Sequence, residues 1–98
     1  MDVNYGLLAK LQARPGRADD LAKLLETARE LAVAENGTVT WYAFRTGDGT
    51  FGIFDTLADE AGRQAHLNGR IPVVLGEVAS ELLSSDPVID EVAIVAVK

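Results

Sequence analysis

Two runs of alternating side chains, separated by glycines, stand out near the middle of the 98-residue chain. Residues 38–45 are rich in β-branched and aromatic side chains, and residues 51–56 resume the same pattern, which is typical of β-strands. The sequence Gly47-Asp48-Gly49 lies between the runs and supplies residues that tolerate positive φ. The pattern therefore predicts a hairpin with its turn near Asp48.

Bulky apolar groups fall on both faces of the first predicted strand. Because side chains alternate across a pleat, two series face opposite ways: Val39, Trp41 and Ala43 against Thr40, Tyr42 and Phe44. A sheet with one face in water would show a polar series here. We therefore expect helices on one face and a second copy of the chain on the other.

The flanking segments show the periodicities of two further strands and three helical stretches. Residues 3–13 read as a partly exposed strand with Leu7, Ala9 and Leu11 on one side. Residues 88–97 read as a final strand with no polar face, buried on both sides. An apolar stripe predicts a helix from near Arg17 to a left-handed cap at Asn36-Gly37: Leu21, Leu24, Leu25, Ala28, Leu31 and Ala32. A two-part helix is expected from about Asp59, capped by the Thr56 hydroxyl, with a break at Asn68-Gly69 and Pro72 in the first turn of its second part.

The order β-α-β-β-α-β predicts one α+β domain over residues 1–98. Two right-handed crossovers place the first and third strands in the centre of an antiparallel sheet, with the helices on one side, which is the ferredoxin-like arrangement. The last strand then lies at an edge, where apolar residues on both faces call for a partner chain. The sequence thus predicts a homodimer.

Composition and charge narrow the classes of function. The formal net charge is −6, which repels nucleic acid and anionic membranes, and no apolar run approaches the length of a membrane span. The chain has no cysteine and one histidine, so we expect no disulfide, no thiolate chemistry and no transition-metal site. No secretory leader pattern is recognisable, so a cytoplasmic location is the expectation.

His66 is the only histidine and the side chain best suited to moving a proton near neutral pH. It falls on the short helix after the hairpin, one turn beyond Gly62. Asp55 shares strand parity with Phe51 and Ile53, so it could be delivered among apolar groups near His66 and orient the imidazole. The alternatives are a helix histidine that is half-exposed or hydrogen-bonded to a neighbouring backbone group, and an aspartate that enters the helix or pairs with Arg45. As a base at a helix surface or pocket position, His66 is expected to tolerate replacement by Ala with little effect on folding and with loss of proton abstraction.

Five of the six aromatic residues lie in the hairpin, which makes it the place to expect a pocket for a flat organic molecule. The hairpin register is open, so either Trp41 or Tyr42 could face the helices. No phosphate-binding loop, dinucleotide fingerprint or nucleophile elbow is present. The expected substrate-binding residues are Trp41, Tyr42, Phe44, Phe51, Ile53 and Leu57.

The segments LLAKLQARPG, ENGTVTWYAFR, TFGIFDT and DEAGRQAHLNG together resemble the antibiotic biosynthesis monooxygenase family of dimeric α+β barrel proteins, and specifically its YgiN-like quinol monooxygenase branch. The resemblance spans nearly the whole chain. By position, Asp55 matches a place where many members have Glu, and His66 matches the family's recurrent helix histidine. Leu57 departs from the pattern, because many members have Trp there, and Asn4 lies too early to match the asparagine of haem-degrading members.

This resemblance implies a cofactor-free oxygenase of a quinol or polycyclic phenol, with O2 as co-substrate and no flavin or metal. In that reading His66 is the base, Asp55 orients it, and the hairpin aromatics form the walls of an apolar chamber. Two alternatives remain: a non-catalytic dimeric ligand-binding or stress-response protein, and an isomerase that uses the same base on an enolisable carbonyl. Haem cleavage is disfavoured.

Overall fold

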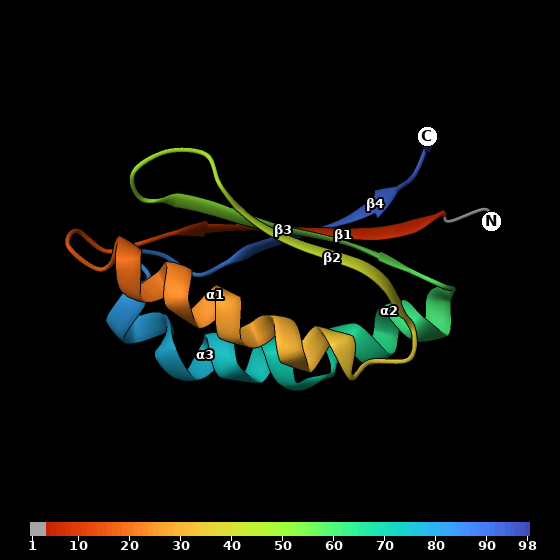
Figure 1. Cartoon of the computed structure of the whole chain (residues 1–98), viewed down its shortest axis with the longest axis horizontal. Coiled ribbons are helices and arrows are strands. Elements are labelled where there is room, and N and C mark those ends of the chain that lie inside the picture. The colour runs from red at the N-terminus through yellow and green to blue at the C-terminus, as the bar shows by residue number, and fades with distance from the viewer. Residues whose placement is uncertain (1–3) are drawn as a thin grey trace.

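A four-stranded antiparallel sheet with helices on one side makes up residues 4–98 of the computed structural model (Figure 1). The strands lie in the order β2-β3-β1-β4, so β1 and β3 are central, as the sequence predicts. In chain order the elements are β1 (Tyr5–Gln12), α1 (Ala18–Val33), β2 (Thr38–Arg45), β3 (Thr50–Leu57), α2 (Glu60–Leu67), α3 (Arg70–Leu82) and β4 (Val88–Ala93). The ferredoxin-like α+β fold is thereby confirmed. The start of the first predicted strand, at Val3, lies outside the described residues.

The core fills the space between the helices and one face of the sheet. Each strand contributes alternate residues, as a pleat requires, and the helices contribute their apolar stripes. The buried apolar side chains include Leu7, Ala9 and Leu11 of β1, Phe51, Ile53 and Leu57 of β3, Leu21, Leu25, Ala28 and Ala32 of α1, and Ile71, Leu75 and Leu82 of α3. The alternation expected for β1 and the stripe expected for α1 are both confirmed.

Two turns differ from the sequence-based predictions. The helix α1 ends at Val33, and its C-cap Ala34 keeps right-handed helical angles, so the predicted left-handed cap at Asn36-Gly37 is wrong. A backbone hydrogen bond forms the turn after α1 instead: the Glu35 amide donates to the Ala32 carbonyl at 3.1 Å. The hairpin turn falls between β2 and β3 as expected, but Gly16 is the one described residue with positive φ, at 79°.

The break between α2 and α3 confirms the two-part helix, with Pro72 in the first turn of α3. The cap of α2 is Asp59, whose Oδ1 accepts from the Gly62 amide at 2.7 Å, and not the Thr56 hydroxyl. Thr56 lies on the opposite face of the sheet, where its Oγ1 is 2.6 Å from the Thr40 Oγ1. A carboxylate at the helix N-terminus serves the exposed amides and the dipole better than a distant hydroxyl.

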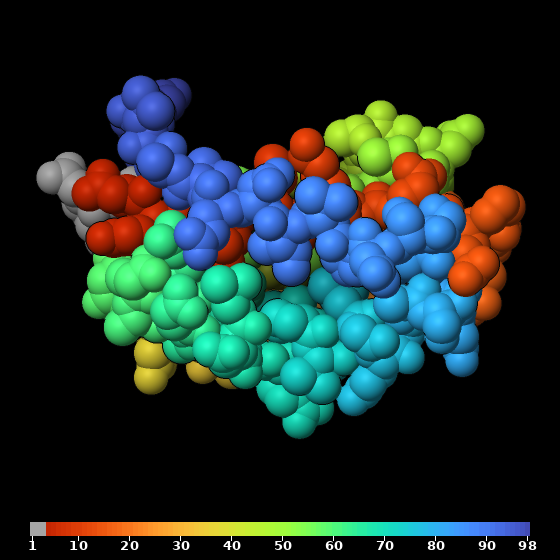
Figure 2. Space-filling model, turned by 180° about the vertical axis from the view of Figure 1, so that it is seen from behind, coloured from red at the N-terminus to blue at the C-terminus, as the bar shows by residue number. Residues whose placement is uncertain are grey.

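The last strand is shorter and more exposed than its sequence suggests. It ends at Ala93, and among the described residues the contact is continued only by the Ile94 amide, which donates to the Asn4 carbonyl at 3.0 Å. The expectation that residues 88–97 form a strand buried on both sides is therefore wrong for the single chain, in which Val95 is 97% exposed. Figure 2 shows the C-terminal residues projecting from the surface at the end of the molecule where α2 lies.

The sheet face opposite the helices carries exposed apolar groups. Tyr42 is 58% exposed, and Phe44 and Val88 are also exposed on this side. We refer to this side of the sheet as the open face. Across residues 4–98, none of the helices combines the length and the apolarity that crossing a membrane requires.

Candidate active site

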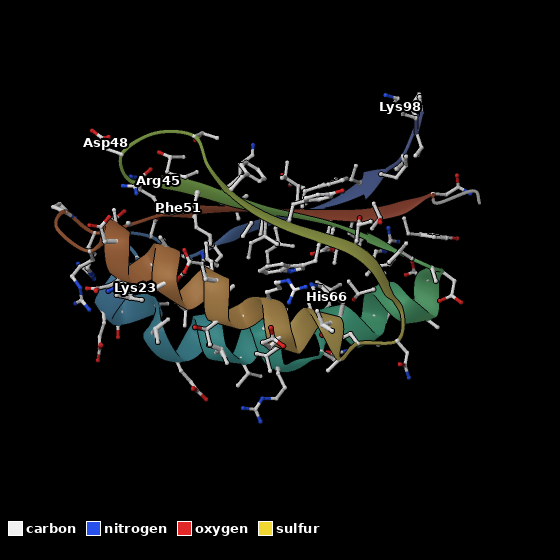
Figure 3. All side chains as sticks on the ribbon, viewed as in Figure 1. Lys23, Arg45, Asp48, Phe51, His66 and Lys98 are labelled. Carbon is white, nitrogen blue, oxygen red and sulfur yellow. The ribbon has the colours of Figure 1, made fainter. Side chains whose placement is uncertain are left out.

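His66 is buried between two carboxylates, in the space between the sheet and the helices (Figure 3). Its Nδ1 lies 2.6 Å from Glu35 Oε1, and its Nε2 lies 3.1 Å from Asp55 Oδ2. The Thr38 hydroxyl donates to the same Glu35 oxygen at 2.8 Å. We call these four residues, Glu35, Thr38, Asp55 and His66, the His66 cluster.

Three chain segments bring the cluster together. Asp55 faces the helices because it shares parity with Phe51 and Ile53 on β3, and its exposure is only 2%. Glu35 comes from the turn between α1 and β2, Thr38 is the first residue of β2, and His66 lies on the inward side of α2. The alternatives of a half-exposed histidine and of an Asp55–Arg45 pair are excluded, because His66 is 6% exposed and Arg45 pairs with Asp19 at 3.5 Å.

Two glycines let the main chains of these segments approach closely. A Cβ added to Gly37 would lie 2.8 Å from the Gly62 Cα, a distance that real Cβ atoms do not reach. The contact lies one helical turn from His66 and two residues from Glu35. It is therefore the missing Cβ atoms at both positions that allow the turn before β2 to deliver its carboxylate to the imidazole.

The electrostatics of the cluster favour a charged imidazole. Burial by itself lowers the pKa of His66, but hydrogen bonds to Asp55 and Glu35, together with their negative charges, outweigh burial and raise the pKa from 6.5 to about 9. At neutral pH His66 is then an imidazolium, and both of its N–H groups donate to carboxylates. A resting imidazolium holds no lone pair for a substrate proton, so His66 acts as a base only after it has given up a proton.

A cavity of about 450 Å³ opens between α1 and the free edge of β2. From α1 it is lined by Ala22, Leu25, Glu26 and Arg29. The sheet contributes the consecutive residues 41–45 and Phe51, as expected where a cavity follows the edge of a strand. Its walls are mainly apolar, with charged groups from Glu26, Arg29 and Arg45.

Trp41 connects this cavity with the His66 cluster. The register pairs Trp41 with Asp55, so Trp41 and not Tyr42 faces the helices, and Trp41 also lines the cavity. The Trp41 indole Nε1 and the Asp55 Oδ1 are both buried, and neither has a hydrogen-bond partner among the described residues. Buried polar atoms of this kind ordinarily find a partner, so they are available to a polar ligand or a water.

The other predicted substrate-binding residues divide between three surroundings. Phe51 lines the cavity and also belongs to the core, whereas Ile53 and Leu57 are buried in the core and do not line it. Tyr42 and Phe44 line the rim of the cavity at the strand edge and are exposed. His66 and Asp55 themselves are not among the lining residues.

Sequence reasoning missed Glu35 and the contribution of α1. Glu35 precedes Asn36-Gly37 and reads as the polar end of a helix, so nothing in its neighbourhood marks it as a partner of His66. The charged residues Glu26 and Arg29 read as the solvent face of α1. Within residues 4–98, no group of three or more His, Cys, Asp or Glu side chains is arranged to hold a metal ion.

Comparison with solved structures places the fold among known proteins. The chain aligns with the structure of a proposed antibiotic biosynthesis monooxygenase from Caulobacter crescentus with a TM-score of 0.79 at 20% identity, over 96% of this chain and 92% of that one. PA3566 from Pseudomonas aeruginosa aligns with a TM-score of 0.81 at 23% identity, over 98% of both chains. The chain thus has the ferredoxin-like fold found in antibiotic biosynthesis monooxygenases, as its sequence predicts.

A closer likeness defines the family of the chain. NE2512, a protein of unknown function from Nitrosomonas europaea, aligns with a TM-score of 0.95 at 49% identity, over 98% of this chain and 93% of that one. The chain belongs to the same family as NE2512. No protein-family model matches the sequence, and no curated protein matches it either.

Proposed function

We propose that the protein is a cofactor-independent monooxygenase that oxidises a quinol or polycyclic phenol with O2. The observation that carries the proposal is the buried His66 cluster, which is joined through Trp41 to an apolar cavity. A buried, charged imidazole between two carboxylates is expensive to maintain, and such groups gather at functional sites. The fold shared with antibiotic biosynthesis monooxygenases supports the same class of reaction.

The reaction balances without a cofactor when the substrate supplies all electrons. A dihydroxyarene and O2 give a hydroxyquinone and water: one oxygen atom enters the ring, and the other leaves as water. The protein then has to hold the phenol, accept its proton and stabilise the anionic states that follow.

The geometry suggests which groups perform these steps. Asp55 Oδ1 has an unused lone pair and would accept the phenolic proton of a substrate that reaches past Trp41, because Asp55 is buried and does not line the cavity in this conformation. The His66 imidazolium stabilises the resulting phenolate and the reduced oxygen species, and it can donate a proton to them. Trp41 Nε1 provides a further donor for an oxygen atom of the substrate.

A non-catalytic, ligand-binding protein is the second candidate, and one observation favours it. His66 and Asp55 do not line the cavity, so a molecule bound there contacts Trp41 without touching the cluster in this conformation. In that case the cluster holds α2 on the sheet, and the cavity binds an aromatic molecule without changing it. No comparable observation favours the isomerase.

Oxygen consumption separates the two candidates. The purified protein is incubated with a panel of hydroquinones and anthrones, and O2 uptake is compared with that of buffer alone. The monooxygenase accelerates uptake for at least one substrate, and with ¹⁸O₂ its product gains a single labelled atom. Asp55→Asn should abolish the acceleration while preserving cavity binding. Binding of the panel without any acceleration above buffer would establish the second candidate.

Assembly and location complete the proposal. The open face exposes Tyr42, Phe44 and Val88, and a second copy that packs its own open face against them would bury this apolar surface. We therefore propose a homodimer with one cavity per chain, acting in the cytoplasm on a small aromatic substrate and O2.

A further inference from the structure

We infer that the cavity between α1 and β2 selects aromatic substrates that carry an acidic substituent, with Arg29 and Arg45 binding the acid. This inference deepens the proposed function, on which it rests, by naming the class of quinol or phenol: an aromatic hydroxy acid. The apolar walls of the cavity favour an aromatic ring. The arginines at the rim of the cavity favour an acidic substituent on that ring.

The charge of the lining is opposite to that of the whole protein. Glu26, Arg29 and Arg45 are its charged members, which gives the lining a formal charge of +1, while the chain as a whole carries −6. Two of the nine Lys and Arg residues therefore lie at one cavity. A local positive region in an acidic protein raises the local concentration of anions and steers them to that place.

Arg45 is held in place at the cavity wall. Its guanidinium lies over the Phe51 ring, with Cζ 5.1 Å from the ring centroid, and Phe51 also lines the cavity. Its Nε donates to the Gly47 carbonyl at 3.0 Å, and its Nη2 donates to the Asp48 carbonyl. Its Nη1 also pairs with the exposed Asp19 carboxylate at 3.5 Å, a surface contact that a ligand acid can displace at small cost. A guanidinium has five N–H donors, so these contacts orient Arg45 without exhausting it.

Arg29 makes weaker contacts than Arg45. Its Nη1 donates to Glu30 Oε1 at 3.0 Å, and the two neighbouring side chains are both well exposed. Surface pairs of this kind contribute little and exchange readily. A ligand carboxylate can therefore take up Arg29 donors at small cost and bind in the forked geometry that guanidinium favours.

The apolar walls fix the other end of the ligand. Leu25, Trp41 and Phe51 enclose a flat ring, and Trp41 presents the only buried indole N–H of the chain, which lacks a partner among the described residues. A ring hydroxyl next to Trp41 and a carboxylate at the arginines make use of both sets of groups. A neutral phenol would leave the arginine end without a ligand group.

A pair of ligands that differ only in the acid tests the inference by binding alone. Isothermal titration calorimetry under anaerobic conditions, which prevent turnover, compares 6-hydroxy-2-naphthoate, whose hydroxyl and carboxylate lie at opposite ends of the ring system, with 2-naphthol. We expect the acid to bind roughly tenfold more tightly, the difference that one added charge-assisted contact of about 1.4 kcal/mol confers. Equal dissociation constants, or no binding of the acid, would overturn the inference whatever the outcome of the O2 assay.

Variants that remove either a positive or a negative charge from the cavity lining make the test specific to the cavity. Arg29→Gln and Arg45→Gln should each reduce the preference for the acid severalfold, while Glu26→Gln should strengthen acid binding. Arg14→Gln, outside the cavity, is the matched control and should leave both ligands unaffected. If Arg14→Gln weakened acid binding as much as the cavity variants do, the attraction would come from the charge of the whole protein and the assignment would be wrong.

Discussion

The Nε2 atom of His66 lies 3.1 Å from Oδ2 of Asp55, and this contact joins α2 to the middle of the sheet. Replacement of His66 by Ala should therefore destabilise the protein, because Asp55 and Glu35 would lose the cation that compensates for their burial. The expected loss is about 3 kcal/mol or more in the free energy of unfolding. Urea denaturation of His66→Ala measures it.

Gln64→Ala provides the control on the same helix, because Gln64 is exposed and bonds only to groups of α2. It should change the unfolding free energy by less than about 0.5 kcal/mol. If His66→Ala and the wild type had equal stability, the cluster would contribute nothing to folding, and His66 would behave like an exposed histidine.

Stability should fall as the pH rises above neutrality. The folded pKa of His66 is about 9, above its ordinary value of 6.5, so the stabilisation is complete below about pH 6.5 and is lost as the pH rises through 9. The shift corresponds to about 3 kcal/mol over the whole range. Melting temperatures at pH 7 and pH 9.5 should show the decline in the wild type and a flatter profile in His66→Gln. Parallel profiles would assign the decline to other groups.

Leu21→Asp should prevent folding, because Leu21 is wholly buried where α1 meets the sheet and a carboxylate there would have no partner. Circular dichroism and the melting curve report the loss. Thr27→Asp, exposed on the same helix, adds the same single negative charge at the surface and should melt like the wild type. A cooperative, wild-type melt of Leu21→Asp would contradict the burial of this helix face.

Gly37→Ala should lower stability, because its Cβ would lie 2.8 Å from the Gly62 Cα and main chain would have to move. A loss of about 1–3 kcal/mol is expected, with a lower pKa of His66 as Glu35 shifts away. Gly76→Ala on α3 is the matched control: its Cβ meets nothing within 4 Å, and the gain in helix propensity should stabilise by up to about 1 kcal/mol. Stabilisation by both changes would show that the two main chains do not touch.

Sedimentation equilibrium at low micromolar concentration should give twice the chain mass of 10.5 kDa. Tyr42→Lys, on the open face, should shift the equilibrium to monomer, because a charge would be desolvated in an apolar interface. Val33→Lys also replaces an exposed apolar residue, but at the end of α1, and should leave the dimer intact. A wild-type monomer would rule out the sheet-to-sheet assembly.

The parity of strand residues is the part of the site that can be predicted from sequence. Asp55 shares parity with Phe51 and Ile53 on β3, so its inward direction and its place near His66 follow from the pleat. The hairpin register could not be predicted, because both Trp41 and Tyr42 are aromatic and either suits a core. The pairing of Trp41 with Asp55 decides it.

Glu35 shows where local patterns stop being informative. Its approach to His66 depends on the contact between Gly37 and Gly62, which lie far apart in the chain and show no joint pattern. The end of β4 has a similar cause. The residues after Ala93 keep the composition of a strand, but the ladder with β1 ends at the pair Tyr5 and Ala93 within the described residues, and a composition does not show where a partner strand ends.

The His66 cluster has two carboxylates and one imidazolium at neutral pH, which gives it a formal charge of −1 in a space shielded from water. Arg45 and Phe51 lie toward one end of the molecule, and His66 lies further along the space between sheet and helices (Figure 3). The site is therefore an electric dipole whose positive end is the arginine end of the cavity. Such a field acts before contact, so it turns an approaching aromatic acid to enter with its hydroxyl toward Trp41 and its carboxylate behind.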